Sequence, residues 1–445
     1  MSSTGDTNRL WRNGLRLGRE RAPSEETVGP STDIPGPYAW GAVSGGYGEL
    51  IRARGVVRII AAQLTARFPS GMLSLGLLFH VEGRTGSYGV AGVVLAALSI
   101  GQALSGPATG RLMGRLGIRP VIVVTTVLCA AAVTSIALLD LHPAGIVVLA
   151  LLAGLTFPPI TSAVRTIYPK LVPASMLGPL FSLDASLQEL IWIGGPVLVT
   201  FLATGVSTTS ALVLSAVLLV GGGAWFAASR EVGRVRIPRS KRRFGAVLLR
   251  PQVALMTVVG FLVIASCAAI EASVAGAFGE DDPTSGVVLA IWSLASLLGG
   301  FALGRLPMRP WSLALRLVVV TAGAALTPFL PGFWGLTTAL VISGFGLAPA
   351  LGLMSAIVSS SVRFSDTAEA YGWTNTGQLV GVALGAALAG QALDRFGAPT
   401  AFLGGATLAA LATIVAAIGI PVSPDLKGRN AGPVPETAPI PLPPS

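Results

Sequence analysis

Two carboxylic acids lie where the sequence is otherwise strongly apolar. Glu189 is followed by an apolar stretch over 190–199, and Asp184 comes five residues earlier. A charge at the centre of a membrane helix costs about 2.5–3.5 kcal/mol, and a carboxyl group removed from water holds a proton more readily near neutral pH. We therefore expect Glu189 to be a group that gains and loses a proton, with a purely structural ion pair or hydrogen bond as the alternative.

Several arginine residues lie in segments where they could form ion pairs with these acids. Arg67 lies within the first apolar segment, where an unpaired guanidinium is costly, so it must face a cavity or a carboxylate, and Glu189 is the expected partner. That pair could break when Glu189 is protonated, or it could be a permanent bridge. For Asp184 we expect an ion-pair cluster with Arg165 and Arg115, and its structural role is favoured over proton coupling.

Polar and aromatic residues in two segments could line a cavity between helices. Gln188 and Trp192 share a helix face with Asp184 because they follow it at intervals of four residues. Glu271 lies in a third apolar segment, where it either meets the substrate or extends to the membrane interface. The expected cavity residues are Gln188, Trp192, Gln378, Asn375, Trp373, Tyr371 and Glu271. Packing between helices is the alternative role for them.

Composition indicates that lipid surrounds the elements that hold these residues. Hydrophobic residues make up 52% of the 445 residues and charged residues only 11%, whereas soluble proteins contain about 25% charged residues. The chain has room for about twelve apolar helices of the length that spans a bilayer. The predicted spans are 56–79, 86–107, 119–140, 144–166, 179–204, 207–229, 251–278, 284–304, 312–330, 333–358, 370–393 and 397–420.

Basic residues are concentrated in alternate loops between these spans. The richest loop, 230–250, separates the sixth span from the seventh, and another follows the second span with Arg111, Arg115 and Arg119. Cytoplasmic loops of membrane proteins carry such an excess of Lys and Arg. We therefore expect a multi-pass protein of the cell membrane with both termini in the cytoplasm. This distribution explains the net charge of +10 without nucleic-acid binding.

The chain divides into two halves that resemble each other. Identical residues recur at a constant offset, in the pairs Gly154 and Gly344, Pro159 and Pro349, Gln188 and Gln378, and Gly195 and Gly385. Because the offset preserves orientation, we expect a parallel duplication; chance matching of Gly-rich and Ala-rich helices is the alternative. The predicted parts are a disordered tail 1–54, a six-helix bundle 55–229, a basic linker 230–250, a second bundle 251–420 and a Pro-rich disordered tail 421–445.

Prolines are expected to interrupt several of the helices. A proline inside a helix removes a backbone hydrogen bond and can kink it. Interruptions at matching positions of two repeats indicate helices that move or that line a binding site. The expected helix breaks are at Pro69, Pro159, Pro196 and Pro349.

A loop motif connects the chain with a known family. Gly110, Leu112, Arg115, Gly117 and Arg119 have the spacing of the signature between the second and third spans of the major facilitator superfamily, which the chain resembles over about 55–420. The expected cytoplasmic gating motif comprises Gly110, Arg111, Arg115, Gly117, Arg119 and Arg165. The family has an Asp where this chain has Gly114, so the charged latch between the halves must be weaker or rebuilt. A second motif, typical of antiporters, is matched only by Gly195–Pro196.

The resemblance implies a fold and a class of function. The fold would be all-α, with twelve transmembrane helices in two pseudo-symmetric six-helix bundles. The protein would be a secondary transporter of the bacterial efflux type, which exports a small amphiphilic drug-like molecule or metabolite by alternating access and proton antiport. A proton-coupled uptake symporter and a non-transporting receptor or scaffold are the alternatives. The expected partners are the substrate, protons and the lipid bilayer, bound by a monomer.

Enzyme chemistry is not indicated by any pattern in the sequence. Cys129 and Cys267 fall in apolar segments, and His80 and His142 are expected in turns, so we expect no metal site. No phosphate-binding loop with its lysine is present, which argues against an ATP-driven pump. We expect no catalytic residues and no cofactor.

Overall fold

Helices make up nearly all of the regular structure. The computed structural model describes residues 47–278, 284–304, 306–426 and 431–434. Within these residues the only β pairing is an isolated bridge between Arg363 and Val434. A chain in lipid must satisfy its backbone polar groups within each segment, and helices do so. Ten of the described helices are long and apolar enough to cross a membrane, and Ser312–Leu326 is a shorter apolar helix.

The first half of the chain contains ten helical elements before the linker. They are α1 (Tyr47–Arg52), α2 (Val56–Arg67), α3 (Pro69–Thr85), α4 (Tyr88–Leu116), α5 (Ile118–Leu138), α6 (Pro143–Leu155), α7 (Ile160–Ile167), η1 (Tyr168–Lys170), α8 (Ala174–Gly205) and α9 (Thr208–Ala228). The linker contains two short elements, α10 (Arg230–Arg234) and η2 (Ala246–Leu249).

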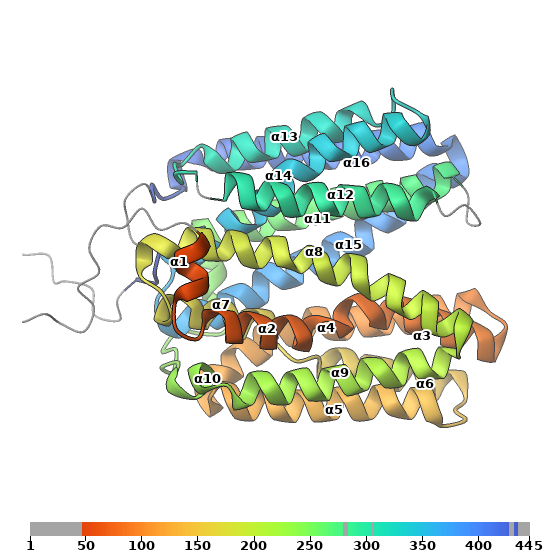
Figure 1. Cartoon of the computed structure of the whole chain (residues 1–445), viewed down its shortest axis with the longest axis horizontal. Coiled ribbons are helices and arrows are strands. Elements are labelled where there is room, and N and C mark those ends of the chain that lie inside the picture. Colours follow the sequence, from red (N-terminus) through yellow and green to blue (C-terminus); the bar gives the residue numbers. More distant parts are fainter. Residues whose placement is uncertain (1–46, 279–283, 305, 427–430, 435–445) are drawn as a thin grey trace, which may run out of the picture. The chain divides into compact units, whose positions relative to one another are not determined.

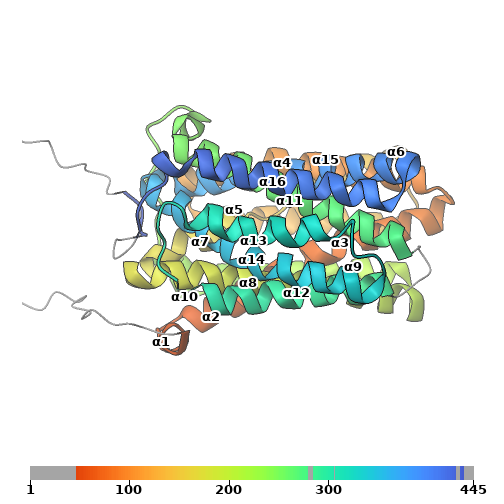
Figure 2. The same ribbon diagram turned by 90° about the horizontal axis from the view of Figure 1, so that it is seen from above.

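The second half contains the remaining elements. They are α11 (Pro251–Phe278), α12 (Thr284–Leu303), α13 (Ser312–Leu326), α14 (Gly332–Ser361), η3 (Phe364–Asp366), α15 (Thr367–Phe396), α16 (Ala398–Ile418) and η4 (Ile420–Val422). The long helices run side by side in both views (Figures 1 and 2). Each predicted span corresponds to one of these helices, or to a pair of them in the first and fourth spans.

Prolines act differently in different helices. Pro69 is the first residue of α3 and separates it from α2, and Pro159 precedes α7 in a non-helical conformation. Pro196 and Pro349, which were expected to break their helices, lie inside α8 and α14. A membrane helix tolerates an internal proline when a neighbour satisfies the freed backbone groups. The carbonyl that Pro349 leaves without its helical donor is that of Phe345. Arg316 on α13 donates from Nη1 to the carbonyl of Pro349 itself at 2.7 Å.

Three expectations about the ends of segments need correction. Residues 47–54 were assigned to a disordered tail, but Tyr47–Arg52 form α1 with Tyr47 and Leu50 buried. In the tail after residue 420, the backbone N–H of Leu426 donates to the Met308 carbonyl, and that of Val434 donates to the Val362 carbonyl. His80 is buried within α3 rather than in a turn, because this helix continues to Thr85. The rest of both predicted tails lies outside the described residues.

Glycines allow the backbones of α3 and α8 to touch. A Cβ atom on Gly71 would lie 2.3 Å from the Ile191 carbonyl oxygen, and one on Gly195 would lie 2.6 Å from the carbonyl carbon of Gly71. Small residues of this kind are how membrane helices approach closely. The match to an antiporter motif at Gly195–Pro196 therefore coincides with a packing contact in the first half.

We expect Gly71→Ala to destabilise the protein by about 1–3 kcal/mol, because the new methyl group would force α3 away from α8. Gly83→Ala is the matched control, since a Cβ at that position of the same helix meets nothing within 4 Å. Thermal unfolding in detergent should show a lower midpoint only for Gly71→Ala. Equal midpoints for the two variants would contradict this packing.

Candidate functional site

The two halves of the chain meet in the part of the bundle nearest the linker. We call this part the linker side; it holds Arg111 near the end of α4 and Glu369 near the start of α15. Helix α4 contacts α15, and α8 contacts both α12 and α14. The closest approaches involve glycines: a Cβ on Gly372 would lie 2.5 Å from the Gly106 carbonyl oxygen, and one on Gly110 would lie 2.5 Å from the Ala368 carbonyl oxygen. Among the described residues, every hydrogen bond between the halves lies between the linker side and the level of Glu189.

A charged latch joins the halves and the linker on this side. Arg111 on α4 donates to the Glu369 carboxylate on α15 at 2.9 Å and also to the Arg242 carbonyl of the linker. The backbone N–H of Gly245 donates to the other oxygen of Glu369 at 2.8 Å, and Arg242 lies 3.7 Å from the Asp366 carboxylate. Of the two expected alternatives, a weaker or a rebuilt latch, these contacts fit a latch rebuilt around Glu369.

The remaining residues of the loop motif have separate places. Gly117 has φ +94, a conformation that favours glycine. Arg119 donates to the carbonyls of Ala227 and Ser229 at the end of α9, as basic residues commonly do at helix C-termini. The linker passes over Gly114, where a Cβ would already lie 3.4 Å from the Pro238 carbonyl oxygen. The larger Asp side chain of the family pattern would meet the linker there.

Arg111→Gln should favour separation of the halves on the linker side, because it removes a partly buried ion pair. We would measure the distance between spin labels at Arg234 and Arg309 by pulsed electron resonance and expect an added population at longer distance. Arg115→Gln, one turn further along α4, should leave the distribution unchanged. A distribution in Arg111→Gln identical to that of the parent protein would contradict the latch.

A second charged cluster lies inside the first half, around Asp184 of α8. The side chain of Asp184 is fully buried. Its Oδ1 accepts hydrogen bonds from Gln63 at 3.2 Å, Arg67 at 3.2 Å and Tyr168 at 3.0 Å. Its Oδ2 accepts from the Nε of Arg165 at 3.1 Å. The predicted pair of Asp184 and Arg165 is present.

Two predicted partners differ from the structure. Arg67 pairs with Asp184 and not with Glu189, and it also donates to the side-chain oxygens of Gln63, at 2.8 Å, and Gln188. The geometry explains the difference, because Glu189 is rotated by about 100° from Gln188 on the helix and faces away from α2. Arg115 is absent from the cluster, and Arg165 belongs to it rather than to the gating latch.

Asp184→Asn should lower the free energy of unfolding by about 3 kcal/mol, since it leaves two buried guanidiniums without a counter-charge. The double variant Asp184→Asn with Arg165→Gln should recover part of the loss. Asp140→Asn, at an exposed acid 3.6 Å from Arg84, should change stability by less than about 0.5 kcal/mol. Denaturant titration in detergent micelles measures these changes; equal stability of Asp184→Asn and Asp140→Asn would refute the assignment.

Glu189 lies at the interface between the halves, facing α12. The residue is 7% exposed, and its carboxylate accepts a hydrogen bond at 2.8 Å from the Ser296 hydroxyl. That hydroxyl also accepts from the backbone N–H of Ala348 at 3.2 Å. Glu271 on α11 is exposed and close enough for electrostatic interaction with Glu189. Among the described residues, no Arg, Lys or His forms an ion pair with Glu189.

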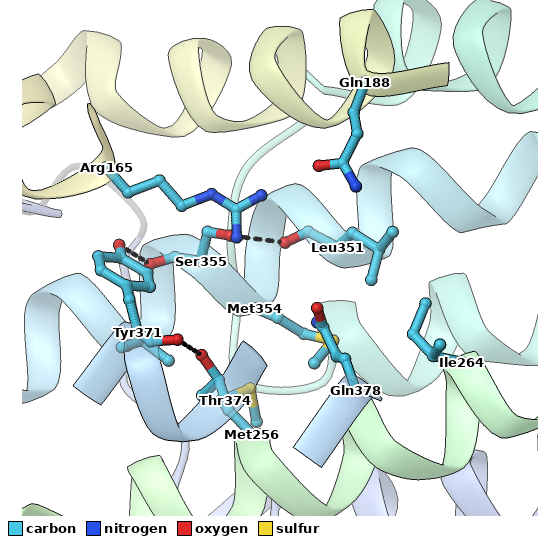
Figure 3. A pocket seen from close by; sticks show the side chains of 11 residues that line it. Arg165, Gln188, Met256, Ile264, Leu351, Met354, Ser355, Tyr371, Thr374 and Gln378 are labelled. Atoms are coloured by element: carbon cyan, nitrogen blue, oxygen red, sulfur yellow. Dashed lines mark hydrogen bonds between the residues drawn. The ribbon is translucent and has the colours of Figure 1, made fainter. Parts of the chain in front are cut away.

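A cavity lies between α7 and α8 of the first half and three helices of the second, with about 430 Å³ of empty space that includes the solvent at its mouth. Figure 3 shows the side chains of Arg165 and Gln188 reaching into it from one side and Met354 and Gln378 from the other. Its lining residues are Arg165, Gln188, Met256, Ile264, Leu351, Met354, Ser355, Val358, Tyr371, Thr374 and Gln378.

Three of the predicted cavity residues line this space, and four do not. Gln188, Gln378 and Tyr371 are part of the lining. Trp192 is 51% exposed because one helical turn carries it about 6 Å beyond Gln188. Trp373 packs on Phe244 of the linker with ring centroids 5.8 Å apart. Asn375 and Glu271 lie outside the lining as well.

Sequence reasoning missed most of the second-half lining. Met256 and Met354 are single residues in apolar segments, without a spacing signal, and methionine is a common packing residue. Ser355 and Thr374 are likewise ordinary residues of membrane helices. Groups of three or more potential metal ligands are absent from the described residues.

Comparisons with known proteins agree with this architecture. The human organic anion transporter MFSD10 (TETRAN) is 17% identical with a TM-score of 0.64, covering 81% of this chain and 99% of that one. The proton:xylose symporter XylE, bound to 6-bromo-6-deoxy-D-glucose, is 12% identical with a TM-score of 0.66, covering 86% and 98%. The E. coli fucose:proton symporter FucP is 17% identical with a TM-score of 0.62, covering 82% and 99%. The TM-scores show a shared fold, and at these low identities they show the fold alone.

Sequence comparison gives the family. A search of curated proteins finds no significant match. The family model described as Major Facilitator Superfamily matches residues 59–306 and 254–442, which together are most of the chain. With its apolar helices of membrane-spanning length and its all-α fold, the chain belongs to the major facilitator superfamily of multi-pass membrane transporters, which are generally non-enzymatic carriers.

Proposed function

We propose that the protein is a proton-coupled secondary transporter that exports a small amphiphilic molecule by alternating access, with Glu189 as the group that carries the proton. The observation that supports this most is the environment of Glu189. It is a buried carboxylate at the interface between the halves, held by a serine hydroxyl and without a cationic partner among the described residues. In such a place the charged carboxylate is poorly solvated, so the protonated form is favoured more than it is in water.

Proton binding at this position would act on the contact between the halves. Deprotonated, Glu189 accepts the hydrogen bond from Ser296 on α12; protonated, it can also donate one. The hydrogen bond is between the halves, so its strength differs between a conformation in which α8 and α12 touch and one in which they separate. A ligand shifts a conformational equilibrium through such differential affinity, and here the ligand is the proton.

The orientation of the chain in the membrane is part of the proposal. The excess of basic residues in the linker and in the loop after α4 favours a cytoplasmic position for the linker side, in the cell membrane. With the halves in contact there, the cavity would be reached from outside. The return step would break the latch at Arg111 and Glu369 and open the linker side. The protein would act as a monomer, and one chain would carry both the substrate and the protons.

Export by antiport is favoured by Gly195–Pro196, and uptake by symport is the second candidate. Two of the structurally similar proteins are proton symporters for sugars, and the third is an organic anion transporter. Antiport predicts that substrate and protons move in opposite directions, and symport predicts that they move together. A non-transporting receptor or scaffold would move neither.

The test uses purified protein in liposomes with an internal pH-sensitive dye and an imposed pH gradient. The probes are naphthalene-2-sulfonate, xylose and ethidium, compared with protein-free liposomes. In the parent protein, at least one probe should move with coupled proton flux, whose direction separates antiport from symport. In Glu189→Gln the gradient-driven movement should fall by at least about tenfold, while exchange of the same probe without a gradient persists.

Asp140→Asn is the control for the loss of an acid, because this side chain is fully exposed. It should retain the gradient-driven transport of the parent protein. Unchanged pH-driven transport in Glu189→Gln would exclude Glu189 as the proton carrier, and absence of flux for every probe would favour the receptor or scaffold.

A further inference from the structure

We infer that the cavity binds a small amphiphilic organic anion with a single negative charge, whose acidic group pairs with the guanidinium of Arg165. This inference rests on the proposed transport function for the role of the cavity, and it adds the class of substrate. Three features of the cavity support it, namely its charge balance, its free hydrogen-bond donors and its apolar far wall.

The charge balance beside the cavity is positive. Arg67 and Arg165 contribute two guanidiniums, and Asp184 contributes the one carboxylate that pairs with both. One positive charge is therefore left without a counter-ion at a position where the three side chains are buried or nearly so. A buried charge without a partner is costly, and a substrate anion would supply the missing partner.

The unpaired charge is presented to the cavity by Arg165. Its Nε is bound to Asp184 at 3.1 Å, which fixes the guanidinium plane, and the group lies 5.9 Å from the centre of the Tyr371 ring. Its two terminal nitrogens form no hydrogen bond with any residue that the structure describes, and Figure 3 shows them at the cavity. Two parallel N–H groups of a guanidinium match the two oxygens of a carboxylate or a related oxyanion.

Gln188 adds a third donor on the same wall. Its side-chain oxygen already accepts a hydrogen bond from Arg67, so the amide nitrogen is the atom left to face the cavity (Figure 3). An amide nitrogen donates and does not accept. The first-half wall thus offers donors, which fit an anion better than an ammonium group.

The opposite wall would hold the apolar body of the ligand. Its apolar side chains are those of Met256, Ile264, Leu351, Met354 and Val358, beside the polar side chains of Ser355, Tyr371, Thr374 and Gln378. Methionines adapt to ligands of different shape. The lining contains no Asp or Glu; Glu189 is turned toward Ser296. The space of about 430 Å³ includes the open mouth of the cavity, so it is an upper limit on the size of the anion in this conformation.

The experiment measures binding to the full-length protein in detergent at fixed pH, by calorimetry. The probes share a naphthalene body: 2-naphthoate and naphthalene-2-sulfonate are anions, 2-naphthamide is neutral and 2-naphthylmethylammonium is a cation. At least one anion should bind at least about tenfold more tightly than the amide and the cation. Arg165→Gln should weaken that anion by about tenfold or more, as expected for hydrogen bonds to a charged group.

Two further variants keep the result interpretable. The double variant Arg165→Gln with Asp184→Asn restores the net charge of the cluster but lacks the two parallel N–H groups of Arg165. It should bind the anion as weakly as Arg165→Gln. Arg115→Gln, which removes a positive charge outside the cavity, should bind like the parent protein. Equal binding of the cation or amide, no binding of either anion, or an unchanged affinity in Arg165→Gln would overturn the inference.

Failure of this inference and failure of the proposed function give different results. Asp140→Asn, at an exposed acid outside the cavity lining, should bind the anion as tightly as the parent protein at fixed pH. If the anion binds and requires Arg165, but gradient-driven transport is unaffected by Glu189→Gln, only the proton assignment fails. If transport depends on Glu189 while the anions do not bind, only the substrate class fails.

Discussion

The carboxylate of Asp184 is the contact on which the arrangement of the first half depends. It lies on α8 and accepts hydrogen bonds from side chains on α2, α7 and η1. A buried carboxylate without cationic partners is costly. Its burial therefore favours the arrangement in which α2, α7 and η1 all reach Asp184. The same contact leaves a surplus of one guanidinium beside the cavity, because one carboxylate serves both Arg67 and Arg165. A structural requirement of the bundle thereby gives the cavity its charge.

The two acids of α8 have opposite environments. Asp184 faces its own half and is bound by cations, whereas Glu189 faces the other half and is bound by the Ser296 hydroxyl. A charge held by two arginines fixes a structure at any physiological pH, but a carboxyl group without a cation responds to proton concentration. In the proposed mechanism that response acts on the contact between the halves, because Glu189 lies between them, and the latch at Glu369 holds the linker side closed.

Most of the fold and only part of the site could be predicted from the sequence. Helices follow from long apolar segments, whose limits are set by prolines, glycines and charges; thus 251–278 was predicted as the span that α11 forms. The pair of Asp184 and Arg165 was also predicted, because both lie near the same ends of consecutive spans. The partner of Arg67 was not, since it depends on the rotation of α8 against α2. Ser296 and Glu369 gave no signal, because their roles arise only when distant segments meet.

The role proposed for Glu189 is to gain and lose a proton as the halves move. Infrared difference spectroscopy on the protein in lipid tests it directly, by following the carboxyl stretch as the pH is changed. We expect a protonated carboxyl band that titrates in the pH range where transport responds, loses intensity in Glu189→Gln and keeps it in Asp140→Asn. A titrating band of undiminished intensity in Glu189→Gln, or a Glu189 that remains charged throughout that range, would contradict this role.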